Sequence, residues 1–307
     1  MSTVPLLCVV GATGTGKTAA ALALAQAVGG AVVNFDSRQV YAGLGIVTAQ
    51  PTADEQAVCP HFLYGYVPVA QPVRAGAFAE EILQAAQTVW SQGLVPILVG
   101  GTGLYLRSLL DGLAPIPEID PAVRTELLAQ CAAQGSPTLY ARLRDIDPEY
   151  ALKIHPNDPQ RICRALEVYA ATGHTLTYWH QHTARPQGLQ ACKIGIAAEL
   201  AALTPRLQTR IQHMLDQGAL EEVERAYALC PDRSAPGFSG IGCPELLAVL
   251  LDNLPLPEAV LQWQRSTRAY AKRQLTWFRK DTDIAWFDGA DHSGMVSVAR
   301  TFLASYM

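Results

Sequence analysis

The stretch GATGTGKT, Gly11 to Thr18, constrains the fold of this chain more than any other feature. It has the spacing G-x-x-x-x-G-K-T and lies between an apolar run, PLLCVV, and a helix-forming run that starts at Ala19. In this strand–loop–helix context the motif is typical of a phosphate-binding loop. Backbone N–H groups converge on a phosphate at the positive end of the helix, Lys17 adds a point charge, and Thr18 can bind Mg²⁺. Because kinases, hydrolases and transferases all use this loop, the motif leaves the phosphate compound open.

Further apolar runs follow the loop, and each is short enough to be a buried strand. They lie at residues 31–35, 95–99, 193–197 and 284–287, with helical patterns between them. Strands that alternate with helices predict an α/β fold with a mostly parallel sheet, in which the run before Gly11 is the central strand. The expected fold class is therefore a P-loop NTPase-like parallel sheet flanked by helices.

A change in composition divides the chain. Pro115, Pro117 and Pro121 cannot lie inside a helix, and from Asp120 to about Gln190 the pattern is almost purely helical. Strand signals return at Ala191. We therefore expect an all-α insertion domain at 114–190, and a P-loop α/β catalytic core formed by residues 1–113 and 191–307.

The charge and cysteine content narrow the function classes. The formal net charge is -4, so binding to nucleic acid would need a local basic patch. The seven cysteines include no C-x-x-C pair, a pattern that favours a reducing cytoplasm and argues against a structural zinc site. No export signal precedes the glycine loop, and no apolar run approaches the roughly 18 residues of a membrane span. We expect a cytoplasmic protein that does not bind membranes.

Two positions near the loop have more than one interpretation. Asp36 ends the second apolar run, at the sheet edge where open α/β folds bind ligands, and could be a magnesium carboxylate or a general base. Thr102, just past the third run, could contact a reacting group, cap the next helix, or both. Arg206 and Arg210 lie four residues apart on one helical face, a spacing also common on solvated surfaces.

A second charged feature lies near residues 262–280, which include no acidic residue. Its basic residues are Arg265, Arg268, Lys272, Arg273, Arg279 and Lys280. Four of them (Arg265, Arg268, Lys272, Arg279) fall in a stripe on one helix face, and Trp263, Tyr270, Ala271, Trp277 and Phe278 lie broadly opposite. The aromatic face is expected to pack on the core. The stripe could track a phosphate backbone or simply be solvated.

Taken together, seven segments in order resemble the tRNA dimethylallyltransferase family over residues 11–279. They are GATGTGKT, DSRQVY, TAQPT, LVGGTGLYLRSLLDGL, HPNDPQRICRALEVYAATG, RIQHMLDQGALEEV and TRAYAKRQLTWFR. The resemblance implies transfer of a dimethylallyl group from dimethylallyl diphosphate to N6 of the adenosine 3′ to the anticodon of tRNA (position 37). The implied products are N6-isopentenyladenosine and diphosphate.

The resemblance also implies roles for residues near the loop. Asp36 would hydrogen-bond to N6–H and remove its proton, and the implied catalytic set is Asp36, Thr102 and Lys17. The diphosphate would be held by Gly11, Ala12, Thr13, Gly14, Thr15, Gly16, Lys17 and Thr18, with Arg210 favoured over Arg206 as a further contact. Mg²⁺ on Thr18, together with backbone donors of residues 13–18, would neutralise the leaving group.

The implied partner is the tRNA anticodon stem-loop, bound by a monomer and contacted in part by the helical insertion. The candidate contacts are Asp36, Ser37, Arg38, Gln39, Thr102, Arg124, Gln160, Arg161, Ile162, Cys163, Arg164, Lys272, Arg273, Gln274 and Arg279. A helix is expected to begin at Pro159 with Asp158 as its cap. Because N6 chemistry requires the base to leave its stack, an unpaired loop is the least costly substrate.

The chain departs from the family pattern at Phe62, Gly65, Gln50, Cys243 and Pro244, where the family commonly has a histidine, an aspartate, a lysine, an aromatic residue and a lysine. The last two are expected near the RNA side. Three alternatives are an isopentenyltransferase for free adenine nucleotides, a P-loop NTP kinase or hydrolase, and an RNA-binding module with a structural loop. The basic stretch and the insertion count against the first, because a mononucleotide needs neither.

Overall fold

The structure is a computed structural model in which residues 3–306 are described. Its sheet has six parallel strands in the order β3 (His61–Phe62), β2 (Gly30–Asn34), β4 (Val95–Gly100), β1 (Val4–Val10), β5 (Leu189–Ile196) and β6 (Ile284–Phe287). The predicted α/β class, the parallel sheet and the interior position of β1 are confirmed. Strand β3 was missed, because two residues at a sheet edge carry too little pattern to be recognised.

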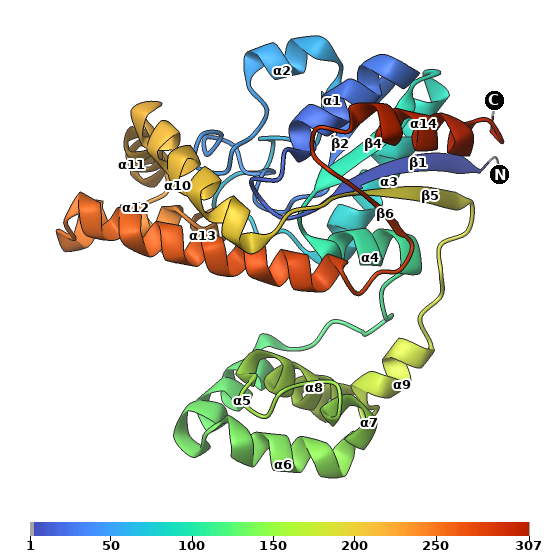
Figure 1. The fold of residues 1–307 in the computed structure, drawn as a ribbon. Coiled ribbons are helices and arrows are strands. Elements are labelled where there is room, and N and C mark those ends of the chain that lie inside the picture. Colours follow the sequence, from blue (N-terminus) through green and yellow to red (C-terminus); the bar gives the residue numbers. More distant parts are fainter. Residues whose placement is uncertain (1–2, 307) are drawn as a thin grey trace. The chain divides into compact units, whose positions relative to one another are not determined.

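Helices cover both faces of this sheet (Figure 1). On one face, α1 (Lys17–Val28) and α14 (His292–Leu303) pack on the side chains of Leu7, Val9 and Ile97. On the other face, α3 (Ala75–Ser91) and α4 (Gly103–Asp111) pack on alternate strand residues such as Val10 and Leu98. Successive residues of a strand face opposite ways, so β1 and its neighbours are apolar throughout because both faces are buried.

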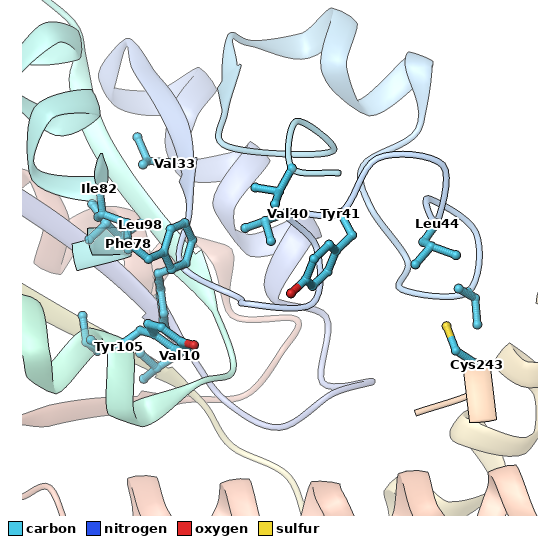
Figure 2. Close-up of a cluster of buried hydrophobic side chains, with 14 of the residues drawn as sticks. Val10, Val33, Val40, Tyr41, Leu44, Phe78, Ile82, Leu98, Tyr105 and Cys243 are labelled. Atoms are coloured by element: carbon cyan, nitrogen blue, oxygen red, sulfur yellow. The ribbon is translucent and has the colours of Figure 1, made fainter. Parts of the chain in front are cut away.

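The core on the α3 and α4 side extends away from the sheet into the chain after Asp36. Figure 2 shows Phe78 and Tyr105 beside the strand residues, and then Tyr41, Leu44 and Cys243 further along. The Phe78 and Tyr105 rings meet edge to face with centroids 5.4 Å apart. This continuous apolar cluster fixes the segment that follows β2 and so holds the backbone around Asp36.

The remaining helices of this part of the chain lie along the sequence after β5, apart from the short α2 (Ala53–Val58). They are α10 (Leu200–Asp216), α11 (Ala219–Leu229), the 3₁₀ turn η1 (Pro236–Ser239), α12 (Cys243–Asp252) and α13 (Leu256–Phe278). Helix α13 packs against α10 and α12. None of the described helices combines the length and apolar character needed to cross a bilayer.

The chain divides into two compact units, one comprising residues 1–110 and 187–307 and the other Asp111–Pro186. The second unit holds α5 (Pro121–Gln134), α6 (Ser136–Ile146), α7 (Pro148–Ala151), α8 (Pro159–Thr172) and α9 (Leu176–Gln181) around its own apolar core. The Asp158 carboxylate accepts a hydrogen bond from the Arg161 amide, so the predicted start and cap of α8 are confirmed. The borders of this unit lie a few residues before the expected 114 and 190.

Candidate active site

The phosphate loop follows β1 and leads directly into α1. Gly14 and Gly16 have φ of 80° and 95°, the left-handed region that favours glycine. A Cβ atom on Gly14 would lie 2.7 Å from Leu207 of α10, so the loop packs closely against that helix. The Thr15 hydroxyl donates to the Ala12 carbonyl at 2.9 Å and closes the turn. Gly11 to Thr18 therefore form the strand–loop–helix unit that the motif predicts.

Lys17 lies partly buried at the start of α1, and its Nζ donates to the Ala12 carbonyl at 2.7 Å. Burial lowers its pKa to about 8, Asp36 opposes this, and Arg210 lowers the pKa further. An anion bound in the loop would oppose the burial effect and restore the charged form. The ammonium group is therefore placed to bind an anion, and a bound anion would extend its charged form to higher pH.

Asp36 comes two residues after the end of β2, and its position is fixed from both sides. The Asn34 side chain accepts from the Asp36 amide at 2.7 Å and donates to the Asp36 carbonyl at 3.0 Å. One carboxylate oxygen, Oδ1, accepts from the Arg38 amide at 3.0 Å, while Oδ2 has no hydrogen bond to any described residue. The negative charge of the carboxylate raises the pKa values of both Lys17 and Arg210. Asp36 thus faces the phosphate loop with one oxygen available for a ligand proton.

Asn34 is a site residue that the sequence analysis missed. It is fully buried, and its amide also donates to the Leu63 carbonyl at 2.9 Å, so it links the end of β2 to the segment after β3. The signal was present in the sequence: an asparagine in the otherwise apolar run AVVNF needs buried hydrogen-bond partners.

Thr102 begins α4 with its backbone, because its carbonyl accepts from the amides of Tyr105 and Leu106. Its hydroxyl oxygen is buried and has no well-aligned hydrogen bond to any residue of the described part of the chain. The Thr102 hydroxyl lies near the hydroxyl of Tyr270. Burial and then Asp36 raise the pKa of Tyr270 to about 12, and the interaction with Thr102 opposes this rise. The Thr102 hydroxyl therefore faces Tyr270 and makes no capping bond to the backbone at the start of α4.

The two arginines of α10 occupy different environments. Arg210 is partly buried, and its Nη1 lies 3.4 Å from the Thr13 hydroxyl in the phosphate loop. Burial lowers the pKa of Arg210, while Glu55 and Asp36 raise it. Arg206 is exposed. The preference for Arg210 over Arg206 as the anion contact is consistent with this geometry.

Gln274 corrects an expectation, because it is buried and cannot present its side chain to RNA. Its Oε1 accepts from the Thr13 amide at 2.9 Å, and its Nε2 donates to the Gly101 carbonyl at 2.9 Å. The Thr13 amide is therefore already used, which leaves the amides after it to cradle a phosphate. Helical periodicity carries the missed signal: Gln274 is three residues after Ala271 and four before Phe278, both buried.

The other residues after Asp36 fix the chain more than they reach outward. Ser37 is buried, and Gln39 donates to the carbonyls of Thr48 and Ala49 at 3.1 and 2.5 Å. Arg38 is partly buried and donates to the Ser239 hydroxyl at 2.5 Å, which ties it to η1. Of the three, Arg38 carries the charge that could serve a nucleic acid.

In the helical unit, four of the six predicted tRNA contacts have accessible side chains. Arg124 and Gln160 are exposed, Arg161 lies 3.4 Å from the cap residue Asp158, and Arg164 pairs with Glu167 at 2.8 Å. Ile162 and Cys163 are 0% and 3% exposed, because they are core residues on the inner face of α8. This corrects the expectation for their side chains, which pack inside the unit.

Helix α13 carries its basic side chains on the outside, as predicted: Arg265, Arg268, Lys272, Arg273 and Arg279 are all exposed. Arg279 pairs with Glu199 at 2.8 Å, and the Arg273 guanidinium lies 5.6 Å from the Tyr270 ring centroid. The opposite face is buried through Trp263, Ala271 and Phe278. Trp277 is 38% exposed, but its indole ring lies against Gly103 at the start of α4, so it also belongs to the packed side.

Three of the departures from the family pattern take structural positions. Cys243 is buried in the core, where burial first and then Glu222 and Glu245 raise its pKa to about 12, so it is not a surface residue near RNA. A Cβ atom on Gly65 would lie 2.8 Å from the Gln50 amide oxygen. Gln50 and Gly65 are therefore neighbours, and two of the departures form one contact.

The residues of the loop fit a divalent cation only if a ligand completes its coordination. No cluster of three or more His, Cys, Asp or Glu side chains within residues 3–306 could hold a metal ion by itself. The Thr18 hydroxyl makes no hydrogen bond to a described residue. Mg²⁺ commonly binds through few protein oxygens together with waters and substrate phosphates, which fits this arrangement.

Comparisons with known proteins agree with the site. The family model described as IPP transferase matches residues 39–281. A tRNA dimethylallyltransferase of Nitratidesulfovibrio vulgaris (strain Miyazaki F) is 50% identical, with 97% of this chain and 93% of that protein covered. One from Oleidesulfovibrio alaskensis is 47% identical, with 98% and 99% covered.

Solved structures give the same relationship. The tRNA isopentenylpyrophosphate transferase of Bacillus halodurans aligns with a TM-score of 0.71 at 32% identity, covering 98% of this chain and 96% of that one. A eukaryotic dimethylallyltransferase acting on tRNA aligns with a TM-score of 0.75 at 27% identity, covering 99% and 79%. By its sequence, its fold and the geometry of its phosphate loop, this chain belongs to the IPP transferase family.

Proposed function

We propose that this chain transfers a dimethylallyl group from dimethylallyl diphosphate to N6 of the adenosine 3′-adjacent to the anticodon of tRNA (position 37). The products are N6-isopentenyladenosine and diphosphate. The observation that carries the proposal is the placement of Asp36. One oxygen of its carboxylate has no hydrogen bond to a described residue, and its charge raises the pKa values of Lys17 and Arg210 beside the anion-binding loop. The names of the relatives supply the two substrates.

The leaving group is held at the phosphate loop. Lys17, Arg210 and the loop amides after Thr13 neutralise the negative charge that develops on the diphosphate as its bond to the prenyl carbon breaks. We propose Mg²⁺ as the metal, bound by the Thr18 hydroxyl and diphosphate oxygens, where it would add positive charge to the leaving group. A loop that hydrolases use to bind a nucleotide therefore serves here as a leaving-group clamp.

The acceptor needs help of a different kind, because the lone pair of N6 is delocalised into the purine ring. In the proposed step N6 forms a bond to the prenyl carbon, the carbon–oxygen bond to diphosphate breaks, and the N6 proton passes to Asp36 Oδ2. The hydrogen bond from the Arg38 amide to Oδ1 orients the carboxylate for this transfer. The buried Thr102 hydroxyl, beside that of Tyr270, is proposed to contact the same adenosine.

The RNA is proposed to bind to exposed cations on both units. These are Arg265, Arg268, Lys272 and Arg273 on α13 with its C-cap Arg279, and Arg124 and Arg161 in the helical unit, where the half-buried Arg164 is a further candidate. Arg38 and Gln160 are further proposed contacts. Such contacts to phosphates supply affinity in a protein whose net charge is -4. We also propose that the protein acts as a monomer, and that it works in the cytoplasm, which suits seven cysteines without a disulfide.

The proposal is tested with labelled dimethylallyl diphosphate and an anticodon stem-loop that carries an A-A-A run. We expect the protein to label the RNA, and Asp36→Asn to lower kcat about 10²-fold or more while the fold is kept. Asparagine is a matched change because it retains the oxygen that accepts from the Arg38 amide.

Three control reactions separate the alternatives. Labelling of free AMP without labelling of the RNA would favour a transferase for adenine nucleotides. Release of phosphate from ATP at a comparable rate would favour a kinase or hydrolase. Full RNA binding by Lys17→Ala without any transfer by the unchanged protein would favour an RNA-binding module.

A further inference from the structure

Gln274 forms the most informative contact that the proposed chemistry does not use. It is 5% exposed, and its carboxamide is fully oriented: Oε1 accepts from the Thr13 amide and Nε2 donates to the Gly101 carbonyl, both at 2.9 Å. The approach is close, because a Cβ atom on Gly101 would lie 2.1 Å from Nε2. The two bonds span segments far apart in the sequence and meet at one side chain.

The two bonded segments belong to different halves of the reaction. Thr13 lies in the loop that holds the diphosphate, and its hydroxyl is the group that Arg210 contacts. Gly101 directly precedes Thr102, the proposed contact to the adenosine. Gln274 therefore connects the leaving-group side of the site with the acceptor side through one rigid amide.

The apolar packing around Gln274 makes this connection stiff. Ala12 of the loop, Leu207 of α10, and Ala271 and Leu275 of α13 form one small buried cluster. Gln274 lies between Ala271 and Leu275 in sequence, so its amide is held by the same packing that holds the loop. The exposed neighbours Lys272 and Arg273 belong to the surface proposed for RNA.

We propose that Gln274 is a positioning residue for the prenyl transfer, which sets the distance between the phosphate loop and the Gly101–Thr102 turn. The inference rests on the proposed function, since it concerns the geometry of that reaction. A displacement requires the attacking and leaving groups in line, and misplacement by about 1 Å can cost about 10²-fold in rate. Loss of the bridge is therefore expected to reduce kcat more than either KM.

The first variant is Gln274→Met, which keeps the volume and removes both hydrogen bonds. We expect kcat to fall about tenfold or more, with KM for dimethylallyl diphosphate and for the RNA within about threefold of the unchanged protein. Gln262→Met, at an exposed position of the same helix, is the matched control and should keep full kcat. Gly101→Ala should reproduce the loss, because its methyl group would displace the amide.

The second variant, Gln274→Glu, gives a readout that a loss of folding would not produce. A neutral carboxyl group can accept from Thr13 and donate to Gly101, as the amide does, whereas a carboxylate cannot donate. The activity of Gln274→Glu, divided by that of the unchanged protein at the same pH, should therefore rise as pH falls. The other titratable groups around the loop, Lys17, Asp36, Arg210 and Tyr270, are present in both proteins, so the ratio reports the effect of the group at position 274.

Each outcome decides the inference. Reduced kcat in Gln274→Met together with a pH-dependent recovery of Gln274→Glu supports it, and the second result alone is sufficient where the methionine variant does not fold. Full kcat in Gln274→Met, or an increase confined to KM, overturns it. Absence of transfer by the unchanged protein would instead overturn the proposed function, so the two failures are distinguishable.

Discussion

Lys17 is the residue whose chemistry depends most on whether the site is filled. In the free protein its ammonium group bonds to the Ala12 carbonyl, and burial lowers its pKa to about 8. The positive charge of Lys17 is therefore present well below pH 8 and is lost as the pH rises through the pKa. An incoming diphosphate must find Lys17 protonated to gain the ion pair.

This leads to a pH prediction for the free protein. The kcat/KM for dimethylallyl diphosphate should fall as pH rises above about 8, approaching tenfold per pH unit, because kcat/KM reports groups of the free enzyme. Lys17→Arg should be slower but lose this decline, since arginine keeps its charge. Initial rates between pH 6.5 and about 9.5 at saturating RNA measure both profiles; a decline of equal size in Lys17→Arg would assign it to another group.

A second residue-scale prediction concerns the neighbours Gln50 and Gly65. Gly65 has φ of 58°, and an added Cβ atom would meet the Gln50 amide oxygen at 2.8 Å. We expect Gly65→Asp alone to destabilise the fold by about 1 kcal/mol, and the addition of Gln50→Lys to recover part of this through an opposite charge. Thermal unfolding of both single variants and of the double variant measures the coupling free energy between positions 50 and 65. Strictly additive effects of the two substitutions would contradict the expected recovery.

Single residues also show where the sequence could not predict the site. Strand ends and the loop motif predict that Asp36, Lys17 and Arg210 lie near one loop, and the structure has Asp36 and Arg210 close enough to change the pKa of Lys17. The resemblance implies that Gln274 contacts tRNA, although its side chain faces inward. A helix face is decided by packing partners from other segments, and local polarity does not reveal them.

At the scale of elements, α13 combines two functions on opposite faces. Its inner face carries Gln274 and the apolar contacts to the phosphate loop, and its outer face carries the basic residues. The predicted strands and the helix after the loop were confirmed, because long apolar runs and the loop spacing are strong signals. Trp277 lies on the packed side as expected, because its indole ring lies against Gly103 of α4, although 38% of the residue stays exposed.

The outer face of α13 gives a prediction about salt. Replacement of Lys272 and Arg265 by alanine should raise KM for the RNA and reduce the slope of log affinity against log salt by about 1 to 2, as expected for two lost phosphate contacts. The rate at saturating RNA should change little. Titrations over a range of salt concentrations measure the slope. Arg233→Ala is the control, because Arg233 is exposed and pairs with Asp252; an equal effect there would contradict a specific role for α13.

At the scale of the whole molecule, the chain inserts one compact unit into another. The helical unit has its own core and its own capping residues, so its organisation could be read from the prolines and from the loss of strand signals. Its exact borders could not, because Asp111 and Pro186 lie in connecting chain where composition changes gradually. Side-chain roles within it also needed the structure, as Ile162 and Cys163 illustrate.

The helical unit carries a prediction about substrate size. Arg124→Ala combined with Arg161→Ala should raise KM about tenfold for a full anticodon stem-loop, because each lost phosphate contact weakens binding. A short single-stranded oligonucleotide with the same A-A-A run should bind equally well to both proteins. Steady-state kinetics with the two RNAs measure the ratio of KM values; an unchanged ratio would mean that these arginines do not contact the stem.

The strand order has a consequence for how the protein is made. Strand β1 is flanked by β4 and β5, and it pairs with β5 over the whole length from Val4 to Val10. During synthesis β1 leaves the ribosome first, while β5 appears only after the helical unit has been translated. Contacts within that unit are local, so it can fold early, whereas the sheet must wait for a distant partner. The nascent chain therefore exposes an apolar strand edge for most of its translation, and this interval is where we expect it to depend on chaperones.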